Sequence, residues 1–127
     1  MTKESGFLVV AALGLTPIAL TYGVVPSASV PMLYGVEVND IGTMHILRAV
    51  MGLYLAMVVF WLMGARNDSL TLPAFYSVVV FMLGLAMGRA ISMVVDGLPA
   101  PLLSVYLVLE IGFGLVGLVL VKGFNAR

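Results

Sequence analysis

The chain has 127 residues, of which 62% are hydrophobic and 9% are charged, with six basic and six acidic side chains and a formal net charge of zero. A soluble domain of this size would carry charges on about a quarter of its residues, so an ordinary water-facing surface is excluded. Each helical span of a membrane needs about 20 apolar residues, so four spans would use roughly 80 positions, close to the hydrophobic content of the chain. The composition therefore predicts an all-α membrane four-helix bundle with short loops, forming a single domain over residues 1–127.

Several functional classes do not fit this composition. The charges sit in short gaps or within apolar stretches, which leaves no connection long enough for a folded catalytic domain outside the membrane. The zero net charge and the lack of a basic run argue against nucleic acid as a partner. With no cysteine, the chain has no disulfide, thiolate nucleophile or zinc-thiolate site.

The first predicted span covers about residues 6–25, which hold no charge and contain Pro17. Proline is tolerated in a membrane helix when neighbouring groups satisfy the freed carbonyl. The alternative is a cleaved signal peptide, with Lys3 as its basic region and Ser27-Ala28-Ser29 as a small-residue cleavage site. We favour the span, because the apolar run exceeds the usual ~7 to 15 residues of a signal-peptide core and Glu4 neutralises Lys3.

Three further spans are predicted after the longest loop, at 26–43, which has room for a short turn of its own. They cover about residues 41–63, 74–95 and 102–121, with a polar connector at 64–73. The third span ends at Asp96-Gly97-Leu98-Pro99, where a glycine followed by a proline is a typical helix stop.

The basic residues outside the spans indicate the orientation. Lys3, Arg66, Lys122 and Arg127 all fall on the side of the two termini and the middle loop, whereas the first and third loops hold no Lys or Arg. Because basic residues are enriched on the cytoplasmic side, both termini are predicted to be cytoplasmic.

Three ionisable side chains interrupt the predicted spans at a common depth. Arg48, Arg89 and Glu110 each lie seven or eight residues from the span end nearest the first and third loops. At a helix rise of about 1.5 Å per residue, each is about 10 to 12 Å below the same membrane face. A charge at such a depth costs about 2.5 to 3.5 kcal/mol on the insertion scale, and residues of this kind usually face the bundle interior and pair with one another.

We therefore expect Glu110 to lie between Arg48 and Arg89. Two arginines and one glutamate would leave an excess of one positive charge, which Asp96 or the anionic group of a ligand would balance. Helical spacing adds further polar residues to the same faces, so that the candidate cluster comprises Arg48, Arg89, Glu110, Asp96, His45, Ser92 and Tyr106. Gly84 and Gly88 form a GxxxG pattern, which allows helices to approach closely.

This cluster has three interpretations: an internal salt-bridge network, a ligand-binding or transport pocket, and a contact surface for another membrane subunit. Asp96-Gly97 is interpreted as a helix terminator rather than as a catalytic acid. His45 is interpreted as a hydrogen-bonded residue rather than as a metal or haem ligand. No catalytic residue, metal site or cofactor is predicted.

The runs Leu47-Arg48-Ala49-Val50-Met51-Gly52-Leu53-Tyr54-Leu55-Ala56 and Gly88-Arg89-Ala90-Ile91-Ser92, followed by Asp96-Gly97 and Glu110, resemble a family of small, mostly bacterial, four-span membrane proteins. The family is catalogued as a domain of unknown function, and the resemblance extends from the first span to about Val121. It implies an inner-membrane protein with Arg48, Arg89, Asp96 and Glu110 at the marked positions of the family. It implies no reaction.

Three functions remain open. The first is a structural or accessory subunit, with a membrane-protein partner or a second copy of the chain. The second is a binder or carrier of an anionic or lipid-like small molecule. The third is a membrane enzyme with Glu110 or His45 as acid or base. The sequence shows no nucleophile with an adjacent base that would support this third function. In each case the lipid bilayer is the surrounding partner.

Overall fold

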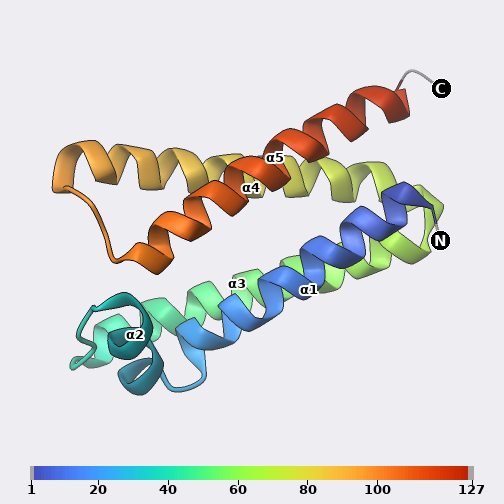
Figure 1. Cartoon of the computed structure of the whole chain (residues 1–127). Helices are drawn as coiled ribbons and strands as arrows, with labels where there is room; N and C mark the ends of the chain where they lie inside the picture. Colours follow the sequence, from blue (N-terminus) through green and yellow to red (C-terminus); the bar gives the residue numbers. More distant parts are fainter. Residues whose placement is uncertain (1, 126–127) are drawn as a thin grey trace.

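The fold is described from a computed structural model, which covers residues 2–125. This part of the chain forms five helices and no strand. The helices are α1 (Lys3–Gly23), α2 (Pro26–Tyr34), α3 (Ile41–Arg66), α4 (Asp68–Asp96) and α5 (Pro101–Asn125) (Figure 1). All of them except α2 are long and apolar enough to cross a membrane. The predicted fold class, an all-α bundle of four membrane-length helices, is confirmed.

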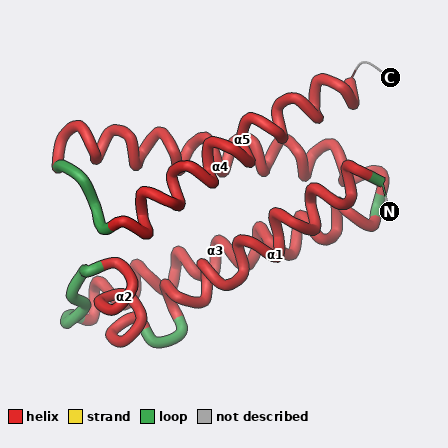
Figure 2. The backbone as a smooth tube through the Cα atoms, in the orientation of Figure 1, coloured by secondary structure: helices red, strands yellow, loops and turns green. Residues whose placement is uncertain are grey.

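The long helices pack as two antiparallel pairs, α1 with α3 and α4 with α5 (Figure 1). The pairs meet where α3 turns into α4, at the end that also holds the start of α1 and the end of α5. Away from this hairpin α4 diverges from α3, and α2 packs across the open end against α1, α3 and α5. The connecting segments are short (Figure 2).

The boundary between α3 and α4 differs from the sequence prediction. The polar connector expected at 64–73 is wrong, because α3 continues to Arg66 and α4 begins at Asp68. Asn67 is the single residue between them, and its side chain accepts a hydrogen bond from the Ser69 backbone N–H at 3.0 Å. The Thr71 hydroxyl donates to the Gly64 carbonyl across the turn at 2.7 Å. The polar side chains therefore cap and join two helices instead of forming a loop.

The loop predicted at 26–43 contains α2. Pro26 is its first residue, a position that proline favours because the N–H it lacks would have no partner within the helix. Gly35 follows the helix with a φ of 70°, a left-handed conformation that glycine adopts readily. The Asp40 side chain then accepts a hydrogen bond from the Thr43 backbone N–H at 2.9 Å and begins α3.

The apolar core has two parts. The larger lies among α1, α3 and α4, where Leu8, Trp61 and Phe75 are fully buried. The smaller joins α2 to α5 through Val30, Tyr34, Val38 and Tyr106. The outward-facing positions of the long helices are also apolar, as in a helix bundle surrounded by lipid.

Candidate functional site

An ion pair between α4 and α5 is the centre of the candidate site. Arg89 Nε donates to both carboxylate oxygens of Glu110, at 2.8 and 3.2 Å. Glu110 is buried, with 7% of its surface exposed. The two residues meet because α4 and α5 are antiparallel and the segment between them is short, so residues at equal distances from the turn come to one level. The pairing of Arg89 with Glu110 was expected from the sequence.

Tyrosines surround the guanidinium group of Arg89. Its Nη2 donates to the Tyr22 hydroxyl of α1 at 3.3 Å. Its central carbon lies 5.8 Å from the centre of the Tyr106 ring, a distance at which a cation and a ring face attract each other. Tyr54 of α3 packs edge-on against Tyr22, with the ring centres 5.7 Å apart. Side chains of α1 and α5 thus contact this charge directly, and Tyr54 of α3 packs behind Tyr22.

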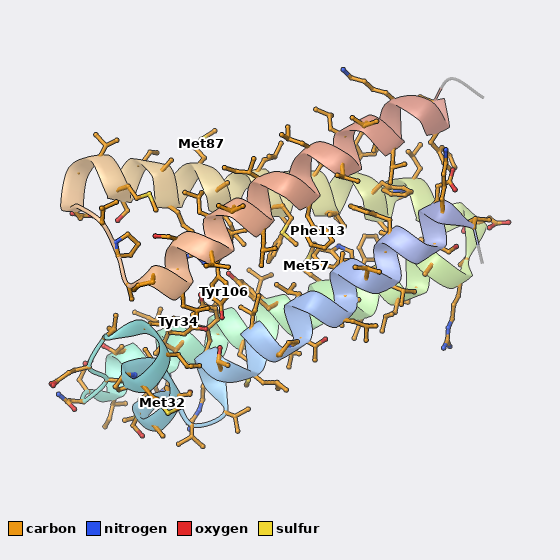
Figure 3. The ribbon with its side chains drawn as sticks, in the orientation of Figure 1. Met32, Tyr34, Met57, Met87, Tyr106 and Phe113 are labelled. Carbon is orange, nitrogen blue, oxygen red and sulfur yellow. The ribbon has the colours of Figure 1, made fainter. Side chains whose placement is uncertain are left out.

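A second set of hydroxyl contacts joins α1, α2 and α5. The Tyr34 hydroxyl lies 2.8 Å from that of Tyr106 and 2.7 Å from that of Thr21. Figure 3 shows Tyr34 and Tyr106 next to each other where α2 meets α5. Tyr106 was predicted from the helical face that it shares with Glu110. Tyr22, Tyr34 and Tyr54 were missed, because no charge marks them in the sequence.

Arg48 does not join the ion pair, so the predicted cluster of two arginines around Glu110 is wrong. Its Nε donates to the Gly23 carbonyl at 3.2 Å, and the side chain is exposed. Gly23 is the last residue of α1, where carbonyls lack helical partners and the helix dipole favours a positive charge. A side chain at Gly23 would collide with Met51, whose Cβ would be 2.5 Å away. This close approach of α1 and α3 brings the end of α1 within reach of Arg48.

The other predicted residues lie at the edge of the site or outside it. The Ser92 hydroxyl donates to the Asp96 carboxylate at 2.7 Å, and both residues are exposed one and two turns beyond Arg89 on α4. Gly97, which has a φ of 102°, follows Asp96 and ends α4, in keeping with a helix terminator. His45 is exposed near the start of α3 and does not line the space around the ion pair.

The ion pair borders a space of about 60 Å³ between the helices, which we call the central cavity. Four polar residues line it, Tyr54, Arg89, Tyr106 and Glu110, and the rest of the lining is small or apolar side chains of α1, α4 and α5. Gly14 on α1 and Leu109 on α5 are both exposed and border the cavity, so it reaches the outer surface between these helices.

Two further depressions adjoin the central cavity. The first, the α1–α5 groove, shares Leu109 and Phe113 with the cavity and is lined by Phe7, Val108, Leu109, Gly112, Phe113 and Val116. The second, the end pocket, shares Arg89 with it and is lined by Arg89, Ser92, Met93, Gly97, Pro99 and Leu103. Together they extend the cavity in both directions along α5, and Phe113 lies two turns beyond Tyr106 on that helix (Figure 3).

Arg89 retains hydrogen-bonding capacity in this arrangement. A guanidinium has five N–H donors. Those of Arg89 reach Glu110 through Nε and Tyr22 through Nη2, and Nη1 has no partner among the described residues. Since no buried side-chain nitrogen in residues 2–125 lacks a partner, Nη1 of Arg89 is not fully buried. A polar group in the cavity or the end pocket, both of which Arg89 lines, can accept a hydrogen bond from it.

The chain matches a known family over most of its length. Residues 4–121 correspond to the family described as Domain of unknown function (DUF4345), a match that includes both Arg89 and Glu110. No curated protein and no solved structure is significantly similar to the chain. The match confirms the resemblance drawn from the sequence motifs. The chain therefore belongs to the DUF4345 family, a domain of unknown function.

Proposed function

We propose that the protein is a membrane-embedded binder of a lipid-like small molecule, which it holds in the central cavity beside Arg89 and Glu110. The observation that carries this proposal is the charged pair on the wall of a mostly apolar cavity that reaches the outer surface between α1 and α5. In a bilayer, that surface is where acyl chains lie. A lipid-like molecule would enter sideways and place its polar end on Arg89.

The energetics favour an occupied cavity over a purely structural pair. Each charge adds about 2.5 to 3.5 kcal/mol to the cost of insertion. A pair that served only to align helices would be most stable in a dry, filled interior, whereas this pair borders a cavity. A ligand in the cavity that forms hydrogen bonds to the pair would reduce the cost of the charges.

We place the protein in the inner membrane with both termini in the cytoplasm. The support is that Lys3, Arg66 and Lys122 belong to helix ends that lie together in the fold (Figure 1). Arg127, the fourth basic residue that the sequence places on this side, lies outside the described residues. The ion pair is then nearer the outer face than the inner face.

A structural or accessory role is the second candidate, and a specific set of contacts favours it. Hydrogen bonds from Arg89 to Tyr22 and between Tyr34 and Tyr106 connect α1 and α2 to the α4–α5 pair. The same residues would then hold the two helix pairs together, for example within an assembly with another membrane protein or a second copy. The two roles differ in whether the cavity is filled.

The proposed function is tested by closing the cavity with a side chain. Gly14 borders it, and a Cβ at this position meets no atom within 4 Å, so the Cβ of Gly14→Leu is accommodated and the rest of the side chain adds bulk at the entrance. Gly88→Leu on α4 is the matched control, because Gly88 is equally unobstructed and lines none of the three depressions.

Both variants and the wild type would be incubated with a bacterial lipid extract in mild detergent and examined by native mass spectrometry. We expect lipid adducts on the wild type and on Gly88→Leu, and about tenfold fewer on Gly14→Leu, which corresponds to ~1.4 kcal/mol of lost affinity. Equal adduct levels on all three proteins would reject the cavity as the binding site.

A further inference from the structure

The net charge at the polar end of the central cavity is zero. Arg89 is paired with Glu110, and Arg48, which the sequence suggested as a second positive charge, is instead bound to the end of α1. The nearest further charge along α4 is the acidic Asp96, which Ser92 holds by a hydrogen bond. The site therefore lacks the positive excess that would favour an anion.

The hydrogen-bonding groups of the pair are complementary to a head that both accepts and donates. Arg89 offers N–H donors that no described residue uses. Among the described residues, Arg89 Nε is the only donor to each Glu110 oxygen, so each oxygen keeps a further lone pair. A hydroxyl group beside a carbonyl can accept from the guanidinium and donate to the carboxylate at once. A phosphate or carboxylate can only accept, and it would bring a second negative charge close to Glu110.

The electrostatics of the pair also favour an uncharged head over an anionic one. An anion near a neutral pair is attracted by one partner and repelled by the other, so the two effects largely cancel. The cost of removing the anion from water remains in full. An uncharged head has a smaller desolvation cost and recovers it through hydrogen bonds.

We infer that the ligand is an uncharged single-chain amphiphile, with a hydroxyl- or carbonyl-bearing head on the Arg89–Glu110 pair and its tail in the α1–α5 groove. This inference rests on the proposed function and specifies its ligand class. A monoacylglycerol has this chemistry. The end pocket, which Arg89 also lines, adjoins this head on the side away from the tail.

The shape of the groove suits a single alkyl chain. It continues from the central cavity through Leu109 and Phe113 and passes Gly112, which contributes no side chain. From Val108 to Val116 the groove follows eight residues of α5, which is about 12 Å of helix. The Phe7 ring forms its α1 side and is held between Phe75 and Phe113, with ring centres at 5.6 and 5.7 Å.

The headgroup is tested with two probes of equal chain length, 1-monomyristoylglycerol and myristyl phosphate, added in competition to the wild type and measured by native mass spectrometry. We expect the uncharged probe to be bound at least about fivefold more, or roughly 1 kcal/mol in affinity. Equal binding, or a preference for the phosphate, would overturn the inference and leave the proposed function standing. Failure of both probes to bind would overturn both.

Two variants sharpen this result. Glu110→Gln removes the negative charge and nearly preserves the shape, so the preference should shift by about tenfold towards the phosphate. An unchanged preference in a folded Glu110→Gln protein would contradict the assigned role of the pair. Gly112→Leu places a side chain in the groove, where its Cβ meets no atom within 4 Å, and should reduce binding of both probes alike. Gly84→Leu, whose Cβ is equally unobstructed and which lies outside the groove, should change neither. Loss of the uncharged probe alone in Gly112→Leu would contradict the placement of the tail.

Discussion

The two ends of the bundle are packed by different means. At the α3–α4 hairpin the helices touch directly: Ala74 contacts the position where Gly64 lacks a side chain, and Trp61 and Phe75 are fully buried. At the α2 end the helices diverge, and an ion pair, tyrosine hydroxyls and a cavity of about 60 Å³ lie between them. The first end contributes rigidity through close contact. The second end keeps space and unused hydrogen-bond donors, which is the arrangement a binding site needs.

The largest expected effect is at the closely packed end. Gly64→Leu places a Cβ against Ala74 and 3.1 Å from the Leu70 carbonyl oxygen, a backbone atom that cannot move aside easily. We expect the free energy of unfolding to fall by about 3 kcal/mol or more, measured by thermal unfolding in detergent. Gly52→Leu on the same helix, where a Cβ meets no atom within 4 Å, should change it little. Similar losses in the two variants would show that close contact is not what stabilises this end.

The ion pair is tested by a double-mutant cycle at the other end. Glu110→Leu leaves the Arg89 guanidinium without its carboxylate, and we expect a loss of about 2 to 3 kcal/mol in the free energy of unfolding. Replacing both residues, Arg89→Met with Glu110→Leu, should recover more than half of this loss, because no unpaired charge remains. A double variant that is less stable than either single variant would contradict the pairing.

We expect Arg48 to contribute to stability and Arg89 to ligand binding. Arg48→Gln removes the cation at the end of α1 and should lower the free energy of unfolding by about 0.5 to 1 kcal/mol. It should leave lipid binding unchanged, whereas Arg89→Gln should abolish it, as read from native mass spectrometry adducts. Reduced binding in a stable Arg48→Gln protein would place this arginine in the site after all.

The smallest effect concerns the start of α3. Hydrogen bonds from the Thr43 hydroxyl and from its backbone N–H hold the pKa of the Asp40 carboxyl below its usual range. Because the pKa is lower in the folded protein than in the unfolded chain, this contribution to stability is present above the ordinary carboxyl pKa. It is lost as the pH falls through the lowered value. Thermal unfolding followed from neutral to acidic pH should show a slightly smaller decrease in Asp40→Asn than in the wild type, and an identical decrease would contradict the prediction.

The sequence predicts some features of the site well and others poorly, for physical reasons. The depth of a charge in a span follows from helix rise, and the short segment between α4 and α5 makes Arg89 and Glu110 neighbours, so this pair is predictable. The depth of a residue in the membrane does not determine which neighbouring helix its side chain contacts. Arg48 lies at the same predicted depth, but its face meets the end of α1, where a carbonyl is available.

Other differences arise from residues that carry no charge. The polar segment at 64–73 resembles a loop in composition, yet its side chains cap and join two helices around Asn67. Tyr34 lies in the segment between the first two spans, and only the position of α2 brings its hydroxyl to Tyr106. The cavity itself depends on how the helices diverge, which no local pattern of residues encodes.

An experimental structure of the protein in lipid nanodiscs containing 1-monomyristoylglycerol would show whether the central cavity holds a ligand. We expect elongated density that begins at Arg89 and Glu110 and continues past Phe113 along the α1–α5 groove. A collapsed cavity with a dry ion pair, or density of this kind only elsewhere on the surface, would contradict the proposal.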